Sequence, residues 1–217
     1  MEAVVVAGGI PQPGEYLYEE TNGNAKAMLD IAGKPMIQWV LDALSGAKTI
    51  DQVVVIGLPA ECCDVRCSKP LSFYPNQADM IENIRTGAVK VMELNPQARH
   101  FLVASSDIPA ITAEMVDWLV HTAMETDDDA YYNVISRDVM EARFPGSRRS
   151  YVHLKGMDVC GGDMNVLRTQ TVTANDTLWQ KIVDARKNAL KQASLLGYDT
   201  LVLLMLRLLT LDKAVQQ

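Results

Sequence analysis

The sequence predicts an α/β fold in which helices cover both faces of a mostly parallel sheet. Short apolar runs rich in β-branched residues, typical of strands buried on both faces, alternate with longer segments of helical periodicity. The chain has 217 residues, of which 48% are hydrophobic and 22% are charged. This size and composition predict one domain over residues 1–217 and exclude a disordered chain, collagen and a coiled coil.

The expected strands are the short apolar runs. They lie at residues 3–7, 52–56, 71–74, 100–104, 131–136 and 151–154. The first run is followed directly by Gly8-Gly9, and the second by Gly57 and Pro59, so both end at residues that favour turns. The last run alternates apolar and polar residues, which is a strand pattern.

The expected helices are the longer periodic segments between these runs. They lie at residues 35–44, 78–94, 113–126, 176–192 and 198–211. Asn95-Pro96 stops the second helix, and Thr112 is placed to cap the third. The polar, arginine-containing segment 137–150 includes Pro145-Gly146 and is predicted to be an exposed loop. The alternative that its arginines hold an anionic acceptor stays open.

The net charge of −7 argues against a protein that coats nucleic acid, because such proteins neutralise phosphates with an excess of Lys and Arg. It leaves room for a small phosphorylated ligand held by a few local cations and a metal ion. The first residues lack the basic region of a signal peptide, and the longest apolar stretch, 201–211, is shorter than the roughly 18 residues of a membrane span. We therefore expect a cytoplasmic protein without a membrane span.

Ligands of parallel α/β sheets bind beyond the carboxyl ends of the strands. The first such end carries Gly8 and Gly9, whose missing side chains let a base or phosphate approach the backbone closely. The spacing is neither that of a Walker A loop nor that of a dinucleotide fingerprint. The long polar stretch 10–25 follows and ends at Lys26. A loop of this length is typical of a lid or a binding loop.

Two acidic positions are candidate magnesium ligands. Asp107 follows the expected strand 100–104, and Mg²⁺ bound to phosphates takes one or two protein carboxylates. The alternative is that Asp107 caps the next helix, although Thr112 is better placed for that role. Near residue 160, Gly161-Gly162 is either a simple turn or a turn that brings Asp163 toward a metal held by Asp107.

Several motifs follow one another in the amino-terminal part of the chain. They are Val4-Val5-Val6-Ala7-Gly8-Gly9, Lys26-Ala27-Met28-Leu29, Ile31-Ala32-Gly33-Lys34-Pro35-Met36-Ile37 and Val40-Leu41-Asp42-Ala43-Leu44. This order resembles the MobA-like nucleotidyltransferases, whose relatives include the sugar-1-phosphate nucleotidyltransferases. Ser105-Ser106-Asp107-Ile108-Pro109 looks like the metal-binding strand end of that superfamily, and residues 161–165 are similar to one of its glycine-pair turns.

The resemblance implies a three-layer α/β/α sandwich of the glycosyltransferase-A type. It implies a reaction in which a nucleoside monophosphate moves from a nucleoside triphosphate (NTP) to a phosphorylated small-molecule acceptor, with release of pyrophosphate. Ala7, Gly8 and Gly9 would contact the nucleotide through backbone groups. Lys26 would contact the triphosphate as a catalytic residue, and Asp107 would coordinate Mg²⁺ or Mn²⁺. Positioning and charge neutralisation are what such a phosphoryl-transfer reaction needs most.

The chain departs from the family pattern at two places. Its loop after Gly9 has no arginine before Lys26, which moves the expected grip on the triphosphate to Lys34 or another group. Relatives often continue beyond the position of Gln217 with a further acidic metal-site segment. The second metal ligand is then Asp163 or Asn165, or the sequence lacks a carboxyl-terminal segment.

Three other interpretations remain open at this stage. A glycosyltransferase on the same fold would bind a nucleotide sugar in preference to the free NTP. A non-catalytic nucleotide-binding module would bind without releasing pyrophosphate, and an unrelated α/β protein would bind neither. No pattern in the sequence identifies the acceptor, the preferred base or the oligomeric state.

Overall fold

The computed structural model describes residues 1–15, 17–60, 64–147, 149–174 and 210. The helices expected at 176–192 and 198–211 lie outside the described residues. The chain divides into two compact units, Met1–Tyr131 with Asp163–Ala174 and Tyr132–Gly162 with Asn175–Gln217. Each unit is described by itself.

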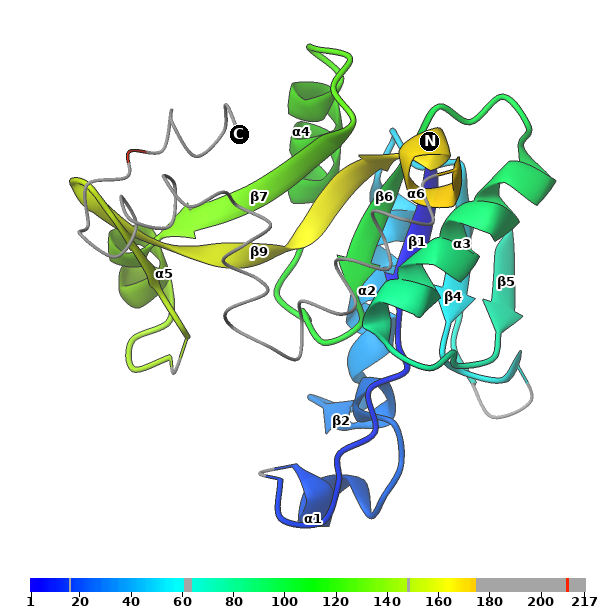
Figure 1. Ribbon diagram of the computed structural model, residues 1–217. Coiled ribbons are helices and arrows are strands. Elements are labelled where there is room, and N and C mark those ends of the chain that lie inside the picture. The colour runs from blue at the N-terminus through cyan, green and yellow to red at the C-terminus, as the bar shows by residue number, and fades with distance from the viewer. Residues whose placement is uncertain (16, 61–63, 148, 175–209, 211–217) are drawn as a thin grey trace. The chain divides into compact units, whose positions relative to one another are not determined.

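A mostly parallel sheet forms the centre of the first unit (Figure 1). Its parallel strands are β1 (Glu2–Val6), β4 (Gln52–Ile56), β5 (Leu71–Tyr74) and β6 (His100–Ser105), in the order β5-β4-β1-β6. The long strand β9 (Met157–Arg168) pairs antiparallel with β6. The bounds of β4 and β5 are those expected from the sequence, because each apolar run is flanked by turn residues.

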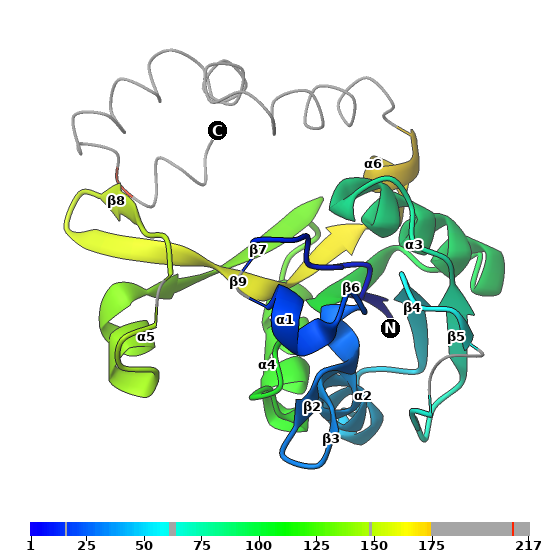
Figure 2. The ribbon, with the colours of Figure 1, turned by 90° about the horizontal axis from the view of Figure 1, so that it is seen from below.

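Helices cover both faces of this sheet, as Figure 2 shows for α3 and α6 on one face and α2 and α4 on the other. Their bounds are Met36–Gly46 for α2, Met80–Leu94 for α3, Ala113–Ala123 for α4 and Thr169–Ala174 for α6. Successive strand residues point to opposite faces. Ala3 and Val5 therefore belong to the core that α2 and α4 close, whereas Val4 packs against Gly87 of α3.

Side-chain caps explain where two of these helices begin. Asp79 accepts hydrogen bonds from the backbone N–H groups of Ile81 and Glu82 at the start of α3. Thr112 accepts one from Met115 at the start of α4, so the capping role belongs to Thr112 and not to Asp107.

The mostly parallel sheet with helices on both faces confirms the α/β class that the sequence predicts.

The loop between β1 and α2 holds small elements of its own. They are α1 (Tyr18–Thr21), the 3₁₀ turn η1 (Lys26–Met28) and the strands β2 (Asp30–Ile31) and β3 (Lys34–Pro35), which pair with each other. The backbone N–H of Lys26 donates to the carbonyl of Gly9 over 2.9 Å. This bond closes the loop and returns the chain to the end of β1.

The second unit corrects two expectations. Residues 137–143 were expected in a loop but form the helix α5 (Arg137–Arg143). Asp138 in its first turn and Arg143 in its last turn stabilise the helix, because their charges are opposite to those of the dipole ends they lie near. Its only described residue that is buried is Met140, so the apolar periodicity was too weak to reveal it. The strands here are β7 (Ala130–Ser136), β8 (Val152–Leu154) and part of β9; β8 and β7 each neighbour β9.

The glycine pair Gly161-Gly162 is the second correction, because it lies inside β9 and not in a turn. A Cβ on Gly161 would lie 2.2 Å from the hydroxyl oxygen of Tyr132, and one on Gly162 would lie 2.7 Å from Nδ2 of Asn133. The glycines therefore make room for side chains of β7 rather than reversing the chain. Across the described residues, no helix has both the length and the apolar character that crossing a bilayer requires.

Candidate active site

The carboxyl ends of β1, β4, β5 and β6 meet at one edge of the sheet. Backbone hydrogen bonds continue past the strands, from Ala7 N–H to the Ile56 carbonyl (2.8 Å), from Gly57 N–H to the Tyr74 carbonyl (2.9 Å) and from Ser106 N–H to the Val6 carbonyl (3.1 Å). These bonds fix the positions of the residues that follow the strands. The carboxyl edge that these residues form is the usual place for a ligand in such a sheet.

The backbones of Gly57, after β4, and Gly8, after β1, are in contact at this edge, and this contact is called the floor of the site. Gly57 has a φ of +116°, and a Cβ built on it would lie 2.2 Å from the Gly8 nitrogen. No side chain fits between these two segments, so both positions expose main chain rather than side chain to a ligand. The amide of Ala7 is already bonded to Ile56, which leaves Gly8 and Gly9 as the neighbouring backbone amides at this edge.

Substituting Gly57 tests this contact. Gly57→Ala is expected to lower the free energy of unfolding by about 3 kcal/mol, because the methyl group adds a clash to an unfavourable backbone conformation. Gly14→Ala is the matched control: its φ is +91°, but nothing lies within 4 Å of the added Cβ. It should lose only about 1 kcal/mol. Urea unfolding measures both, and equal losses would contradict the proposed contact.

The side chain of Lys26 lies over Gly9 of the Gly8-Gly9 pair that follows β1, which is called the glycine turn from here on. A Cβ on Gly9 would lie 2.8 Å from Cε of Lys26, so the aliphatic part of the lysine side chain (its stem) runs over the Gly9 backbone. Gly9 is exposed, and the Lys26 side chain is 35% exposed to solvent. The ammonium group is therefore held at the edge, where an anion can reach it.

Lys26 pairs with Asp107, which follows β6. The lysine Nζ lies 3.0 Å from Oδ2 of Asp107, and both side chains are 35% exposed. The hydroxyl of Ser105 donates to the other carboxylate oxygen, Oδ1. The structure thus brings together two predicted site residues that are far apart in the sequence.

The pKa of the Asp107 carboxyl lies below its ordinary value. Burial works in the opposite direction and raises the pKa, because it disfavours the charged form. The hydrogen bonds from Ser105 and Lys26, with the positive charge of Lys26, together outweigh it. Asp107 is therefore ionised at neutral pH and can act as a ligand for a cation.

Asp163 lies beside the same strand end. In the antiparallel pairing of β6 with β9, Ala104 is opposite Met164, and Ser105 and Asp163 follow one residue further toward the edge. Asn165 lies deeper, opposite Val103. The part of the chain that the structure describes holds no cluster of three or more His, Cys, Asp or Glu side chains suited to a metal. Two carboxylates nevertheless fit Mg²⁺ that also binds phosphates, since such an ion keeps several waters.

A pair of asparagines at this edge was not foreseen from the sequence. Asn83 of α3 is only 3% exposed, and its Nδ2 donates to Oδ1 of Asn76 over 2.8 Å. A Cβ on Gly8 would lie 1.8 Å from that Asn76 oxygen, so the amide packs directly on Gly8. One signal was present: Asn83 interrupts an otherwise apolar buried face of the helix, which includes Ile81, Ala88 and Val91.

A hollow of about 540 Å³ opens next to this floor. It is lined by Ile10, by the loop segments 20–25 and 28–30, and by residues 57–59. The long loop after β1 and the end of β4 therefore border a space that is large enough for a small molecule, and its lining includes Gly57, which packs against Gly8.

The family comparison decides the assignment of the chain. The model of the MobA-like NTP transferase domain matches residues 3–189, which includes the glycine turn, Lys26, Asp107 and Asp163. The chain belongs to this family. The comparison with curated proteins gave no match.

Several solved structures share the fold of this MobA-like NTP transferase. A hypothetical transferase from Thermus thermophilus is 28% identical with a TM-score of 0.82, over 99% of this chain and 87% of that one. CMP:2-keto-3-deoxy-manno-octonic acid synthetase complexed with CTP is 15% identical with a TM-score of 0.56, over 89% and 85%. 4-Diphosphocytidyl-2C-methyl-D-erythritol synthase from Anaerococcus prevotii is 12% identical with a TM-score of 0.55, over 84% and 74%.

Lys34 of this MobA-like NTP transferase is not brought together with Lys26 and Asp107. Its ammonium group pairs with Asp42 of α2 and lies 3.6 Å from the centroid of the Trp39 ring.

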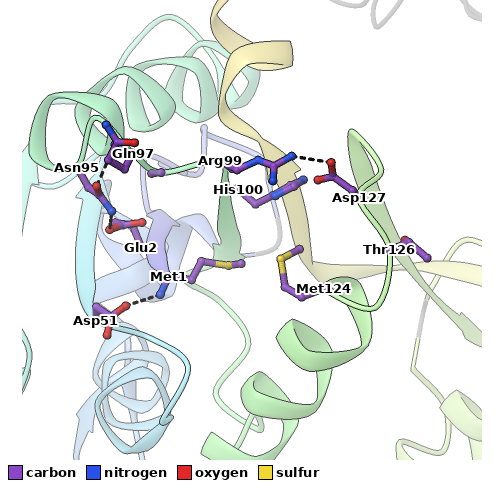
Figure 3. Close-up of a pocket in the computed structure, with 11 residues that line it drawn as sticks. Met1, Glu2, Asp51, Asn95, Gln97, Arg99, His100, Met124, Thr126 and Asp127 are labelled. Atoms are coloured by element: carbon purple, nitrogen blue, oxygen red, sulfur yellow. Dashed lines mark hydrogen bonds and ion pairs between the residues drawn. The ribbon is translucent and has the colours of Figure 1, made fainter.

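A second hollow, also about 540 Å³, lies at the opposite, amino-terminal edge of the parallel strands (Figure 3). Met1, Glu2 and His100 line it, and none of the predicted site residues does.

Proposed function

We propose that this chain is a cytoplasmic nucleotidyltransferase in which residues 1–217 act as one domain. It moves a nucleoside monophosphate from an NTP to a phosphorylated small-molecule acceptor and releases pyrophosphate. The observation that carries the proposal is the Lys26–Asp107 pair beside the exposed Gly9, at the carboxyl edge of the sheet. Membership in the family and the fold shared with an enzyme complexed with CTP support an NTP as the donor.

Lys26 and the glycine turn provide the binding of the donor. Phosphates bind well where backbone N–H groups converge near a lysine, which acts as a point charge. The stem of Lys26 lies over Gly9 and its ammonium group is held by Asp107 beside it, so a phosphate that binds at Gly9 would lie next to this ammonium group. The backbone groups of Gly8 and Gly9 lie beside it.

Asp107, with Asp163 beside it, would hold Mg²⁺ or Mn²⁺. When bound, such an ion neutralises phosphate oxygens of the donor. Ser105 keeps Asp107 in one orientation by bonding to its Oδ1 and leaves Oδ2 for an exchangeable partner. In the free chain that partner is Lys26.

The acceptor supplies its own nucleophile. A phosphate oxygen of the acceptor attacks the α-phosphorus in line, the new P–O bond forms, and the bond to the bridging oxygen of the β-phosphate breaks. That electron pair leaves with pyrophosphate, so no covalent enzyme intermediate is required. Lys26 contributes by stabilising charge on the transferred and departing phosphates, which in such sites is the main source of rate enhancement.

Thermal melts with the common NTPs, each with and without Mg²⁺, test the proposal. A ligand at about 100 times its dissociation constant stabilises by about 2.7 kcal/mol. For a chain of this size the melting temperature should rise by about 5–10 °C with one or more NTPs, and only when metal is present. Release of pyrophosphate is then followed with phosphorylated acceptors.

Other results of these melts and of the pyrophosphate assay would favour a different function or contradict the proposed one. A shift with nucleotide sugars that exceeds the shift with NTPs would favour a glycosyltransferase. Binding of NTPs without pyrophosphate release for any acceptor would favour a binding module. No shift with any nucleotide would contradict the proposal.

A further inference from the structure

The buried side chain of Asn83 has a fixed hydrogen-bonding polarity. Its Oδ1 lies 2.8 Å from the backbone nitrogen of Gln77, and its Nδ2 lies 2.8 Å from Oδ1 of Asn76. The two ends of an amide cannot be told apart from shape alone, but a backbone N–H can only donate. The end of Asn83 that faces Gln77 must therefore be the oxygen, and the end that faces Asn76 must be the NH₂ group.

This polarity passes on to Asn76. The NH₂ group of Asn83 needs an acceptor, so the carbonyl oxygen of Asn76 must face it. The NH₂ group of Asn76 is the other branch (fork) of its amide, and it is directed away from Asn83. Asn76 is exposed, and its Nδ2 has no hydrogen-bond partner among the residues that the structure describes. A hydrogen-bond donor of defined orientation is thus available to a ligand.

The position of this donor connects it to the nucleotide site. Oδ1 of Asn76 packs on Gly8, where a Cβ would come within 1.8 Å of it. Gly8 follows β1, and its nitrogen would lie 2.2 Å from a Cβ on Gly57, which follows β4. Asn76 follows β5 by two residues. The ends of three neighbouring strands therefore place the Asn76 amide over the glycine turn.

We propose that Asn76 reads the nucleobase of the donor as a hydrogen-bond donor, and that Asn83 fixes this polarity without touching the base. The inference rests on the proposed nucleotidyltransferase function. On the Watson–Crick edge, the ring nitrogen of cytosine or adenine accepts a hydrogen bond, whereas that of uracil, thymine or guanine carries a hydrogen. An NH₂ group facing that nitrogen selects CTP or ATP. The wrong base leaves two donors facing each other, which weakens binding about 10-fold or more.

Asn83→Asp inverts the polarity while keeping the size of the side chain. One carboxylate oxygen still accepts from Gln77, and the other oxygen now requires a donor. The Asn76 amide then turns over, gives its NH₂ group to residue 83 and presents its oxygen to the base. Calorimetric titration with CTP, ATP, UTP and GTP in excess Mg²⁺ should show CTP or ATP bound about 10-fold tighter than UTP and GTP by the original chain. The variant should show the reverse ranking.

Asn76→Asp gives an independent test at an exposed position, where folding is not endangered. It places oxygen on both forks, so the preference for a ring-nitrogen acceptor should disappear. The added charge weakens all four NTPs alike, and the ratio between bases is therefore the readout. Gln97→Glu, exposed near the opposite edge of the sheet, is the control for charge and should leave both ranking and affinity unchanged.

The outcomes separate this inference from the function on which it rests. If the chain binds NTPs but prefers UTP or GTP, or if both variants keep the original ranking, Asn76 does not read the base, although the nucleotidyltransferase function stands. If no NTP binds in the presence of Mg²⁺, both proposals fail. An inverted ranking in Asn83→Asp supports the inference, because a merely structural role of a buried residue does not reverse a base preference.

Discussion

Asp107→Asn is expected to slow nucleotidyl transfer about 100-fold or more, while making NTP binding tighter when no metal is present. The loss of rate follows from the loss of the charged ligand at the strand end. The gain in metal-free affinity follows from the Lys26–Asp107 pair, in which the nitrogen and oxygen lie 3.0 Å apart. With Asn at this position, Lys26 is free for the triphosphate and no carboxylate repels it.

The size of the gain is set by the ion pair. A partly exposed pair stabilises by up to about 1 kcal/mol, so metal-free affinity should rise about two- to fivefold. In the original chain, Mg²⁺ and NTP should each strengthen binding of the other, because each releases one member of the pair for the other ligand. Such coupling is typically about 5- to 150-fold and is reciprocal.

A matched variant isolates this effect. Glu93→Gln removes the same charge from another lysine–carboxylate pair, Lys90–Glu93, in which the nitrogen and oxygen lie 2.7 Å apart within α3. It should change neither transfer nor NTP affinity. If Asp107→Asn binds NTP more weakly than the original chain in the presence of a chelator, Lys26 is not held back by Asp107, and the coupling is contradicted.

Lys26→Met is expected to lower the transfer rate about 100- to 1000-fold, because it removes the cation that lies over the glycine turn. Methionine keeps the length of the stem that packs on Gly9. Stability should change by less than about 1 kcal/mol, since Asp107 is 35% exposed and can be hydrated when it loses its partner. The rate of pyrophosphate release and a urea titration measure the two quantities.

Lys90→Met serves as the control for this substitution. Lys90 also pairs with a carboxylate and contacts an aromatic ring, that of Tyr74, at 5.1 Å from its centroid. A rate close to that of the original chain is expected for Lys90→Met. Equal losses in both variants would show that general charge, and not the position of Lys26, determines the rate.

Much of the fold could be predicted because its signals are local. The apolar runs that became β4 and β5 are bounded by turn residues, and Thr112 caps α4 as expected. The helix α5 was missed because its polar surface hides a single buried methionine, Met140. The glycine pair in β9 was misjudged because its cause, the side chains of Tyr132 and Asn133, lies in another strand.

Several residues of the candidate site stand out in the sequence, but the contacts between them do not, and Asn76 and Asn83 were not among the predicted residues. Lys26 and Asp107 each stood out from their own surroundings in the sequence, yet nothing local indicates that they pair over 81 positions. The Asn76–Asn83 bond depends on how the loop after β5 enters α3. Long-range contacts of this kind follow from the register of the sheet, which a single sequence does not reveal.

A calorimetric titration of the original chain and of Lys26→Met with NTPs in excess Mg²⁺ tests the placement of the triphosphate beside Lys26 and Asp107 most directly. We expect binding of at least one NTP to the original chain and an affinity that is lower in the variant by a factor of about 10 or more, with the loss confined to ligands that carry the triphosphate. Equal affinity in the two proteins, with NTP bound, would contradict the placement of the triphosphate beside Lys26 and Asp107.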